Sequence, residues 1–330
     1  MGRFLELEKR RQAELKRNSG FFSANARRDG TYKGKPRPFC LSRDRADENL
    51  FPTIRDAVLV YFPDERLVWP DGHDGMPSNH LCDSQVCCVN FLQPFSDRPD
   101  ALVELLRPLY PAINRVLSME PKHPDQFVSF EWIGEENYLG EKVPKHGRRV
   151  RGANCTSADA AVMFQREDGS KQTVLIEWKY TESYSSTSLR IAPSGTDRTL
   201  TYAPLYERED CPLHKSLLSE FSDLFYEPFY QFMRQQFLAH EMERAKEQGA
   251  DTVSVLHIAP ERNLDFRKVT SPALRSLGAS ATDAWNRLVR TPDRFRSVST
   301  EELFGRFPVE EFPELAGWWS YINERYSWLR

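Results

Sequence analysis

Two strongly apolar runs separated by a short turn limit what this chain can fold into more than any other feature. Residues 157–165 and 172–180 are rich in alanine, branched aliphatic and aromatic side chains, and Asp168-Gly169 lies between them. Apolar runs of this length, bounded by turn residues, are typical of strands buried on both faces. We therefore expect a β-hairpin at the centre of an α/β core.

Charged side chains interrupt both runs. Asp159 lies in the first run, and Glu177 and Lys179 lie in the second. Side chains two positions apart in a strand project from one face, so Glu177 and Lys179 point the same way. Buried carboxylates repel each other and lose hydration, and Lys179 offsets only part of that cost. A hard divalent cation, Mg²⁺ or Mn²⁺, would offset the rest. The alternative is a buried Glu–Lys ion pair with an unrelated Asp nearby.

The length of the hairpin loop decides whether Asp159 joins the other two side chains. A three-residue loop at 167–169 would place Asp159 directly opposite Glu177. A two-residue turn would place it opposite Trp178 and separate the carboxylates. The predicted site therefore needs the odd-length loop or a bulge.

The rest of the chain adds helices and further strands around this hairpin. Helical patterns are expected at 79–95, 99–119 and 215–248, with a break at Pro228, and strands at 126–134 and 252–260. This order predicts an α/β fold with a mixed central sheet flanked by helices.

Length and charge suggest the domain organisation. Residues 47–330 are expected to form a single domain, with its core at about 99–260 and a C-terminal helical addition at 261–330. Residues 1–46 carry 13 Lys and Arg against 5 Asp and Glu, and we interpret them as a basic, partly flexible extension that begins with a short helix. The net charge of the chain is −3, so any phosphate-binding surface must be local.

Several classes of protein are not expected. No apolar run approaches the roughly 20 residues that span a membrane, and the N-terminal residues lack a secretory signal pattern. The sparse cysteines do not form a disulfide framework, which favours a reducing, cytoplasmic environment. No P-loop is present, so any ATP-driven activity would require a partner protein.

Asp159 and the Glu177-Trp178-Lys179 triplet resemble the motif of the PD-(D/E)XK nuclease superfamily, which has the restriction-endonuclease-like fold. The core of that family is αβββαβ, and the pattern matches it over about 99–260, with helical N- and C-terminal additions. Ala158 replaces the family's Pro. The wider sequence of residues 130–184 resembles an uncharacterised bacterial group described as restriction endonucleases.

The resemblance implies metal-dependent hydrolysis of DNA phosphodiester bonds. Asp159 and Glu177 would bind Mg²⁺ or Mn²⁺ together with the backbone carbonyl of Trp178. Lys179 would orient the attacking water and stabilise the developing negative charge. Glu131 is the first candidate for a further metal-binding acid.

Other residues are weaker candidates for the same site. Glu104 and Glu141 are alternatives to Glu131, although a surface carboxylate is the competing interpretation for each. Gln231 and Gln235 are spaced i, i+4 on the second core helix and could reach the site, or they could be ordinary helix-surface residues.

Contact with DNA needs local positive charge. The segment that leads into the Asp159 strand contains five cations and His146, and we interpret it as a phosphate-gripping loop, with a solvated loop as the alternative. The cations are Lys142, Lys145, Arg148, Arg149 and Arg151. Residues 1–46 could be a DNA-touching arm or a solvated mobile tail.

The function predicted in this way is an endonuclease in restriction or phage defence, with DNA as partner and a homodimer as an expectation. Two alternatives stay open. One is a RecB-like repair exonuclease, and the other is a catalytically inert DNA-binding or scaffold protein that retains the fold.

Overall fold

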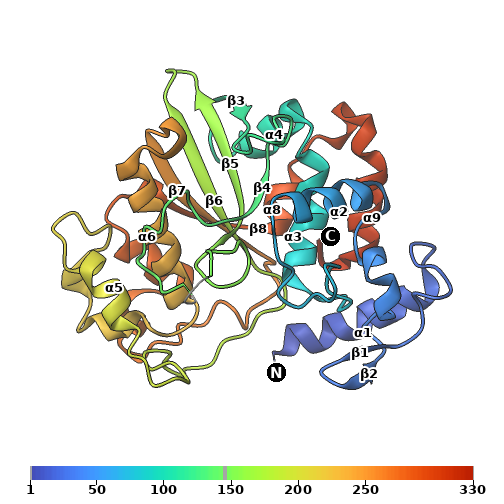
Figure 1. The fold of residues 1–330 in the computed structure, drawn as a ribbon, viewed down its shortest axis with the longest axis horizontal. Coiled ribbons are helices and arrows are strands. Elements are labelled where there is room, and N and C mark those ends of the chain that lie inside the picture. Colours follow the sequence, from blue (N-terminus) through green and yellow to red (C-terminus); the bar gives the residue numbers. More distant parts are fainter. Residues whose placement is uncertain (1, 144–146, 330) are drawn as a thin grey trace.

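The computed structural model describes residues 2–143 and 147–329, and a six-stranded mixed sheet lies at its centre (Figure 1). The strands are β3 (Ile113–Leu117), β4 (Ser129–Trp132), β5 (Ala158–Arg166), β6 (Lys171–Trp178), β7 (Thr252–Ala259) and β8 (Phe295–Ser299). The sheet order is β3-β5-β6-β7-β8, and β4 pairs with the other end of the β5 edge that β3 occupies. β5 is antiparallel to its neighbours, whereas β6, β7 and β8 are parallel.

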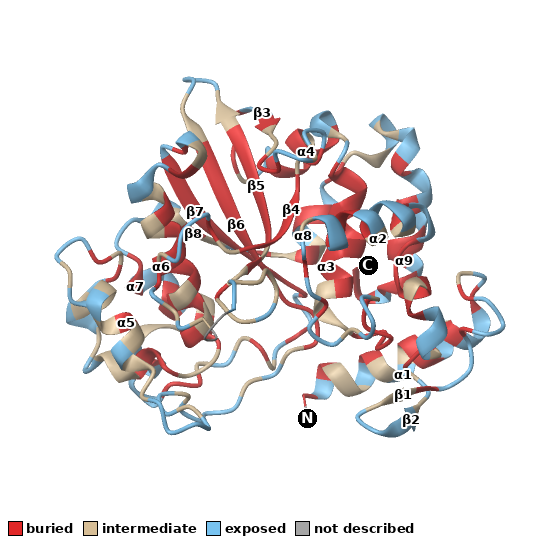
Figure 2. Cartoon of the chain, in the orientation of Figure 1, coloured by how far each residue is buried: buried red, intermediate tan, exposed pale blue. Residues whose placement is uncertain are grey.

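Helices cover both faces of the sheet, which confirms the predicted α/β class (Figure 1). They are α1 (Arg3–Asn18), α2 (Arg55–Asp64), α3 (Ser84–Leu92), α4 (Pro99–Leu106), α5 (Thr199–Tyr206), α6 (Phe229–Ala245), α7 (Ala281–Leu288), α8 (Thr300–Gly305) and α9 (Ala316–Arg325). Side chains of β5 alternate between two cores: Val162 packs with α2, α3, α4, α8 and α9, and Ala161 packs with α6 and α7. The central strands are therefore buried on both faces (Figure 2).

The hairpin of β5 and β6 has the odd register that the site requires. Ala160 pairs with Ile176, and the Arg166 backbone N–H donates to the Ser170 carbonyl at 2.8 Å. The loop is therefore three residues long, and it closes through Gly169, whose φ of +85° is favourable only for a residue without a side chain. The condition that the predicted site places on the loop is therefore met.

Some predicted elements were wrong in extent. The helix expected at 99–119 ends at Leu106, and Ile113–Leu117 forms strand β3 instead. Prolines at positions 108 and 111 stop the helix, and pairing with β5 then decides the conformation. In the helix expected at 215–248, the stretch before Pro228 contains two short 3-10 turns, and α6 begins at Phe229. The break at Pro228 is confirmed.

The N-terminal segment packs onto the rest of the chain. Tyr180 donates its hydroxyl hydrogen to Glu8 of α1 at 2.7 Å, and Gln12 donates to the Arg325 carbonyl at 2.9 Å. The interpretation of this helix as a solvated tail is therefore wrong. After it, strands β1 (Gly30–Tyr32) and β2 (Lys35–Arg37) form a small hairpin.

The C-terminal segment 261–330 contributes strand β8 as well as the expected helices, and the sequence did not indicate this strand. Trp318, Tyr326 and Trp328 of this segment are buried and belong to the core on one face of the sheet. None of the helices in residues 2–143 and 147–329 is long and apolar enough to cross a membrane.

Candidate active site

Three carboxylates lie at the same level of three neighbouring strands. Glu131 occupies the β4 position between the pairs Phe130–Ala160 and Trp132–Ala158, which sets it opposite Asp159. The register of β5 with β6 sets Asp159 opposite Glu177. The structure thus brings Glu131, Asp159 and Glu177 together, whereas Glu104 forms an ion pair with Arg107 on α4.

Each carboxylate of this group already has a protein partner. Glu177 Oε1 lies 2.5 Å from Lys179 Nζ, at an angle that does not make a hydrogen bond. Asp159 Oδ2 accepts from the backbone N–H of Trp178 at 2.6 Å. Glu131 accepts from the Gln85 side chain at 2.7 Å and from the Ser157 hydroxyl at 2.6 Å.

Burial makes this concentration of negative charge costly. It raises the pKa of Asp159 well above its ordinary value, Glu177 adds to the increase, and Lys179 opposes it. Burial also raises the pKa of Glu131 to about 7, although hydrogen bonds from Ser157 and Gln85 lower it in part. For Lys179, burial is the largest single effect and lowers the pKa, but the neighbouring groups, Glu177 first among them, together outweigh burial and hold the pKa well above its ordinary value. The ammonium group is therefore charged at neutral pH.

The donor set suits a hard divalent cation, since it consists of carboxylate oxygens and a backbone carbonyl. Glu177 Oε1, the oxygen beside Lys179 Nζ, is buried without a hydrogen bond, and the Trp178 carbonyl accepts a long contact, 3.5 Å, from Ser84 Oγ. Within the described ranges, however, no three His, Cys, Asp or Glu side chains already stand in a metal-binding arrangement. Binding of a cation would therefore require side chains of this group to move.

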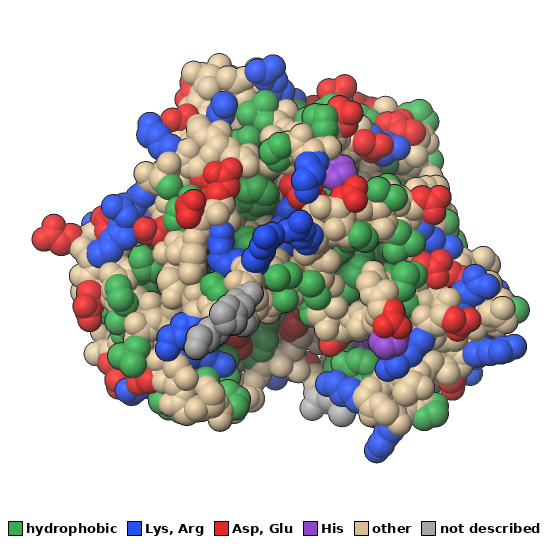
Figure 3. Space-filling model, viewed as in Figure 1, with side chains coloured by type: hydrophobic (Ala, Val, Ile, Leu, Met, Phe, Trp, Pro, Cys, Tyr) green, Lys and Arg blue, Asp and Glu red, His purple; other side chains and the backbone are tan. Residues whose placement is uncertain are grey.

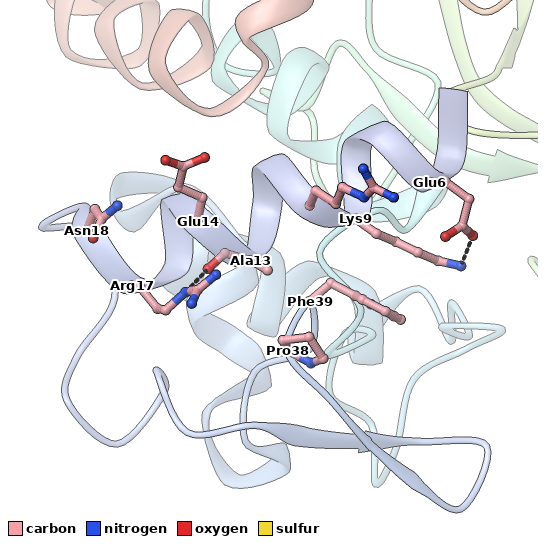
Figure 4. Close-up of a pocket in the computed structure, with 9 residues that line it drawn as sticks. Glu6, Lys9, Ala13, Glu14, Arg17, Asn18, Pro38 and Phe39 are labelled. Carbon is pink, nitrogen blue, oxygen red and sulfur yellow. Dashed lines mark hydrogen bonds and ion pairs between the residues drawn. The ribbon is translucent and has the colours of Figure 1, made fainter. Parts of the chain in front are cut away.

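A cleft of about 1000 Å³ opens above Asp159 and Glu131. One wall consists of α1 and the β1–β2 hairpin, another of the start of α3, and a third of α6. The surface is hollowed between the part that holds α6 and the part that holds α1 (Figure 3). A second, smaller hollow along α1 shares Glu6, Lys9 and Phe39 with this cleft (Figure 4).

The two glutamines of α6 reach the site in different ways. Gln235 is buried and donates to the Ser157 carbonyl at 2.6 Å, two residues before Asp159. It fixes the entry of β5, so the helix-surface interpretation is wrong for this residue. Gln231 lines the cleft and accepts from the Tyr184 hydroxyl at 3.4 Å.

The segment predicted to grip phosphates divides into two groups. Arg149 donates to three backbone carbonyls between residues 133 and 135, and Arg151 forms an ion pair with Glu120 at 2.7 Å. These two guanidinium groups are already bound to protein acceptors and stabilise the segment. Lys142 and Arg148 are exposed, and Lys145, like His146, lies outside the described residues.

Other residues at the site gave no clear signal in the sequence. Gln85 and Ser157, which hold Glu131, are two of them. Glu141, by contrast, was an alternative candidate to Glu131. It accepts from the backbone N–H and hydroxyl of Thr156 at 2.6 and 2.5 Å, so it shapes the approach to β5 and does not join the carboxylate group. Arg234 also lines the cleft. Its only sequence signal is its position between Gln231 and Gln235 on one helix.

The mixed sheet, the flanking helices and the Asp–Glu–Lys group define a restriction-endonuclease-like protein. Residues 9–327 match the model of the family described as "Restriction Endonuclease associating with ARP". The chain therefore belongs to this family. No curated protein and no solved structure matches the chain.

Proposed function

We propose that this protein is a metal-dependent endonuclease that hydrolyses phosphodiester bonds of DNA. The observation that carries the proposal is the group of three carboxylates beside a charged lysine, two of which, Glu131 and Asp159, line an open cleft. The family description, which names a restriction endonuclease, supports it. On the same description we expect a role in restriction or phage defence.

The charges of the site residues suggest different roles for the carboxylates and for the lysine. Asp159, Glu177 and Glu131, with the Trp178 carbonyl, would hold Mg²⁺ or Mn²⁺. When bound, the cation would polarise the phosphate and lower the pKa of a coordinated water. Lys179 keeps its proton, so it cannot accept one from water. Its role is to orient the attacking water and to stabilise negative charge that develops on the phosphate.

A catalytically inert scaffold is less well supported than an enzyme. Buried like charges destabilise a fold unless they are compensated, and apolar residues of similar volume would pack without that cost. The presence of buried Glu131 and Glu177 on either side of the half-buried Asp159 is therefore better explained by a bound cation. Cutting both strands of a duplex would need two such sites, for which a homodimer is the simplest source.

The test is an incubation of the protein with closed circular and linear DNA in Mg²⁺, in Mn²⁺ and in EDTA. Wild type should cut circles in either metal and lose activity in EDTA. Lys179→Ala should be inactive, and Lys122→Ala, which removes an exposed lysine, should cut like wild type. Degradation of linear DNA alone would favour the exonuclease alternative. Cleavage by Lys179→Ala, or cleavage in EDTA, would reject the mechanism.

A further inference from the structure

Two arginines with unsatisfied donors face the cleft from opposite sides. Arg37 comes from β2 and Arg234 from α6, and both line the cleft above Asp159. The Nε–H group of each is buried without a hydrogen-bond acceptor. In the part of the chain that the structure describes, neither guanidinium forms an ion pair with a carboxylate. A buried donor without a partner is unfavourable, so each of these guanidinium groups is suited to an anionic ligand in the cleft.

Among the described residues, the carboxylates on the walls of this cleft do not pair with Arg37 or Arg234. They accept hydrogen bonds from, or form ion pairs with, other residues of the protein. Glu182 accepts from the Tyr180 N–H at 2.6 Å, and Asp83 accepts from the N–H of Val86 at 2.8 Å. The other acids along these walls are Glu6, paired with Lys9, and Asp71, which accepts from Tyr32.

Aromatic rings lie beside the cations on the wall of the cleft that α1 and the β1–β2 hairpin form. Tyr32 and Phe39 are half-buried, line the cleft, and contact the His80 ring with centroids 4.8 and 4.9 Å apart. The ammonium group of Lys9 lies 5.1 Å from the Phe39 ring centre, with its side chain stretched along α1 (Figure 4). Lys33 is placed in the same way over Tyr32, at 5.2 Å.

Basic groups interleaved with exposed ring faces are typical of surfaces that bind single-stranded nucleic acid, because bases stack on the rings and phosphates meet the cations. Residues 1–46, which supply this wall, hold 13 of the 45 Lys and Arg but only 5 of the 48 Asp and Glu. The volume of the cleft, about 1000 Å³, is at the upper end of what drug-sized ligands occupy. It suits a few nucleotides better than a complete double helix.

We propose that this cleft binds a single-stranded segment of the DNA substrate and leads it to Asp159. Phosphates would contact Arg37 on one side and Arg234 on the other, and a base would stack on Tyr32 or Phe39. The proposal rests on the nuclease function for the identity of the substrate, but the binding itself does not require cleavage. The preferred substrates would be DNA with unpaired nucleotides, such as a flap, a gap or a melted site.

The test measures binding in EDTA, where no cleavage is expected, by fluorescence anisotropy with a labelled oligonucleotide of about 12 nucleotides. The same sequence is used as a single strand and as a blunt duplex. Wild type should bind the single strand more tightly. Arg37→Gln, Arg234→Gln and Tyr32→Leu should each weaken that binding about five- to tenfold. Each arginine variant should also reduce the slope of log affinity against log salt by about 0.7.

Arg275→Gln is the matched control, since this arginine is exposed and lies outside the cleft. Thermal unfolding of every variant checks the fold, and Arg234→Met, which also removes the charge but keeps a long side chain, replaces Arg234→Gln if the latter unfolds early. Tighter binding of the duplex, or arginine variants that bind like Arg275→Gln, would overturn the proposal even if the enzyme cuts DNA. A wild type that binds the single strand but never cleaves it would reject the nuclease function and leave the binding site standing.

Discussion

The substitution Glu131→Gln should make the metal-free protein more stable at alkaline pH. Burial, opposed in part by hydrogen bonds from Ser157 and Gln85, raises the pKa of this carboxyl from an ordinary 4.5 to about 7. The folded protein therefore holds the proton more strongly than the unfolded chain does. The free energy of unfolding should fall as the pH rises through the window from 4.5 to 7. At 1.36 kcal/mol per pKa unit, the loss from this one group is roughly 3 kcal/mol.

Glutamine never ionises, and its single side-chain oxygen can accept from only one of Gln85 and Ser157, which bind different oxygens of Glu131 in the wild type. Urea unfolding in EDTA at pH 5, 7 and 8 should therefore show a weaker pH dependence for Glu131→Gln than for wild type, and a gain of up to about 3 kcal/mol at pH 8. Glu136→Gln, an exposed control, should behave like wild type. Added Mg²⁺ should stabilise wild type more than the Glu131 variant. If the free energy of unfolding depended on pH in Glu131→Gln as it does in wild type, and the variant showed no gain at pH 8, the raised pKa of Glu131 would be refuted.

Two further substitutions test how the site is held. Gln235→Ala removes the 2.6 Å hydrogen bond to the Ser157 carbonyl, so it should lower the free energy of unfolding in urea by about 1–2 kcal/mol and slow cleavage. An unaffected cleavage rate would show that this hydrogen bond does not position β5. Tyr180→Phe leaves the buried Glu8 carboxylate without its 2.7 Å donor, so it should lower the free energy of unfolding by about 1–3 kcal/mol and expose α1 to limited proteolysis. An N-terminal segment as resistant to proteolysis as in wild type would contradict this packing.

The centre of the site could be predicted from the sequence because it depends on local geometry. Strand alternation places Glu177 and Lys179 together, and a three-residue loop places Asp159 opposite them. Neither step needs knowledge of distant parts of the chain. The family resemblance made Glu131 a candidate for a further acid, but only pairing between β4 and β5 put it in the group.

The errors arose where distant segments decide the outcome. Residues 113–117 have apolar side chains at helical spacing, yet pairing with β5 makes them a strand. Arg149 and Arg151 look like free cations in the sequence, but their acceptors come from residues 120 and 130–135. The sequence did not predict the cleft for the same reason, since Arg37 and Arg234 line it together only in the folded chain.

The most direct test of the central claim compares wild type with Asp159→Asn on closed circular DNA. This substitution keeps the size of the side chain and an oxygen that can accept from the Trp178 N–H, but it removes one negative charge from the proposed cation site. Wild type should nick or linearise the circles in Mg²⁺ or Mn²⁺, and the folded variant should be at least a hundredfold slower in both metals. Equal cleavage by the two proteins, or intact circles with wild type in both metals, would contradict the account.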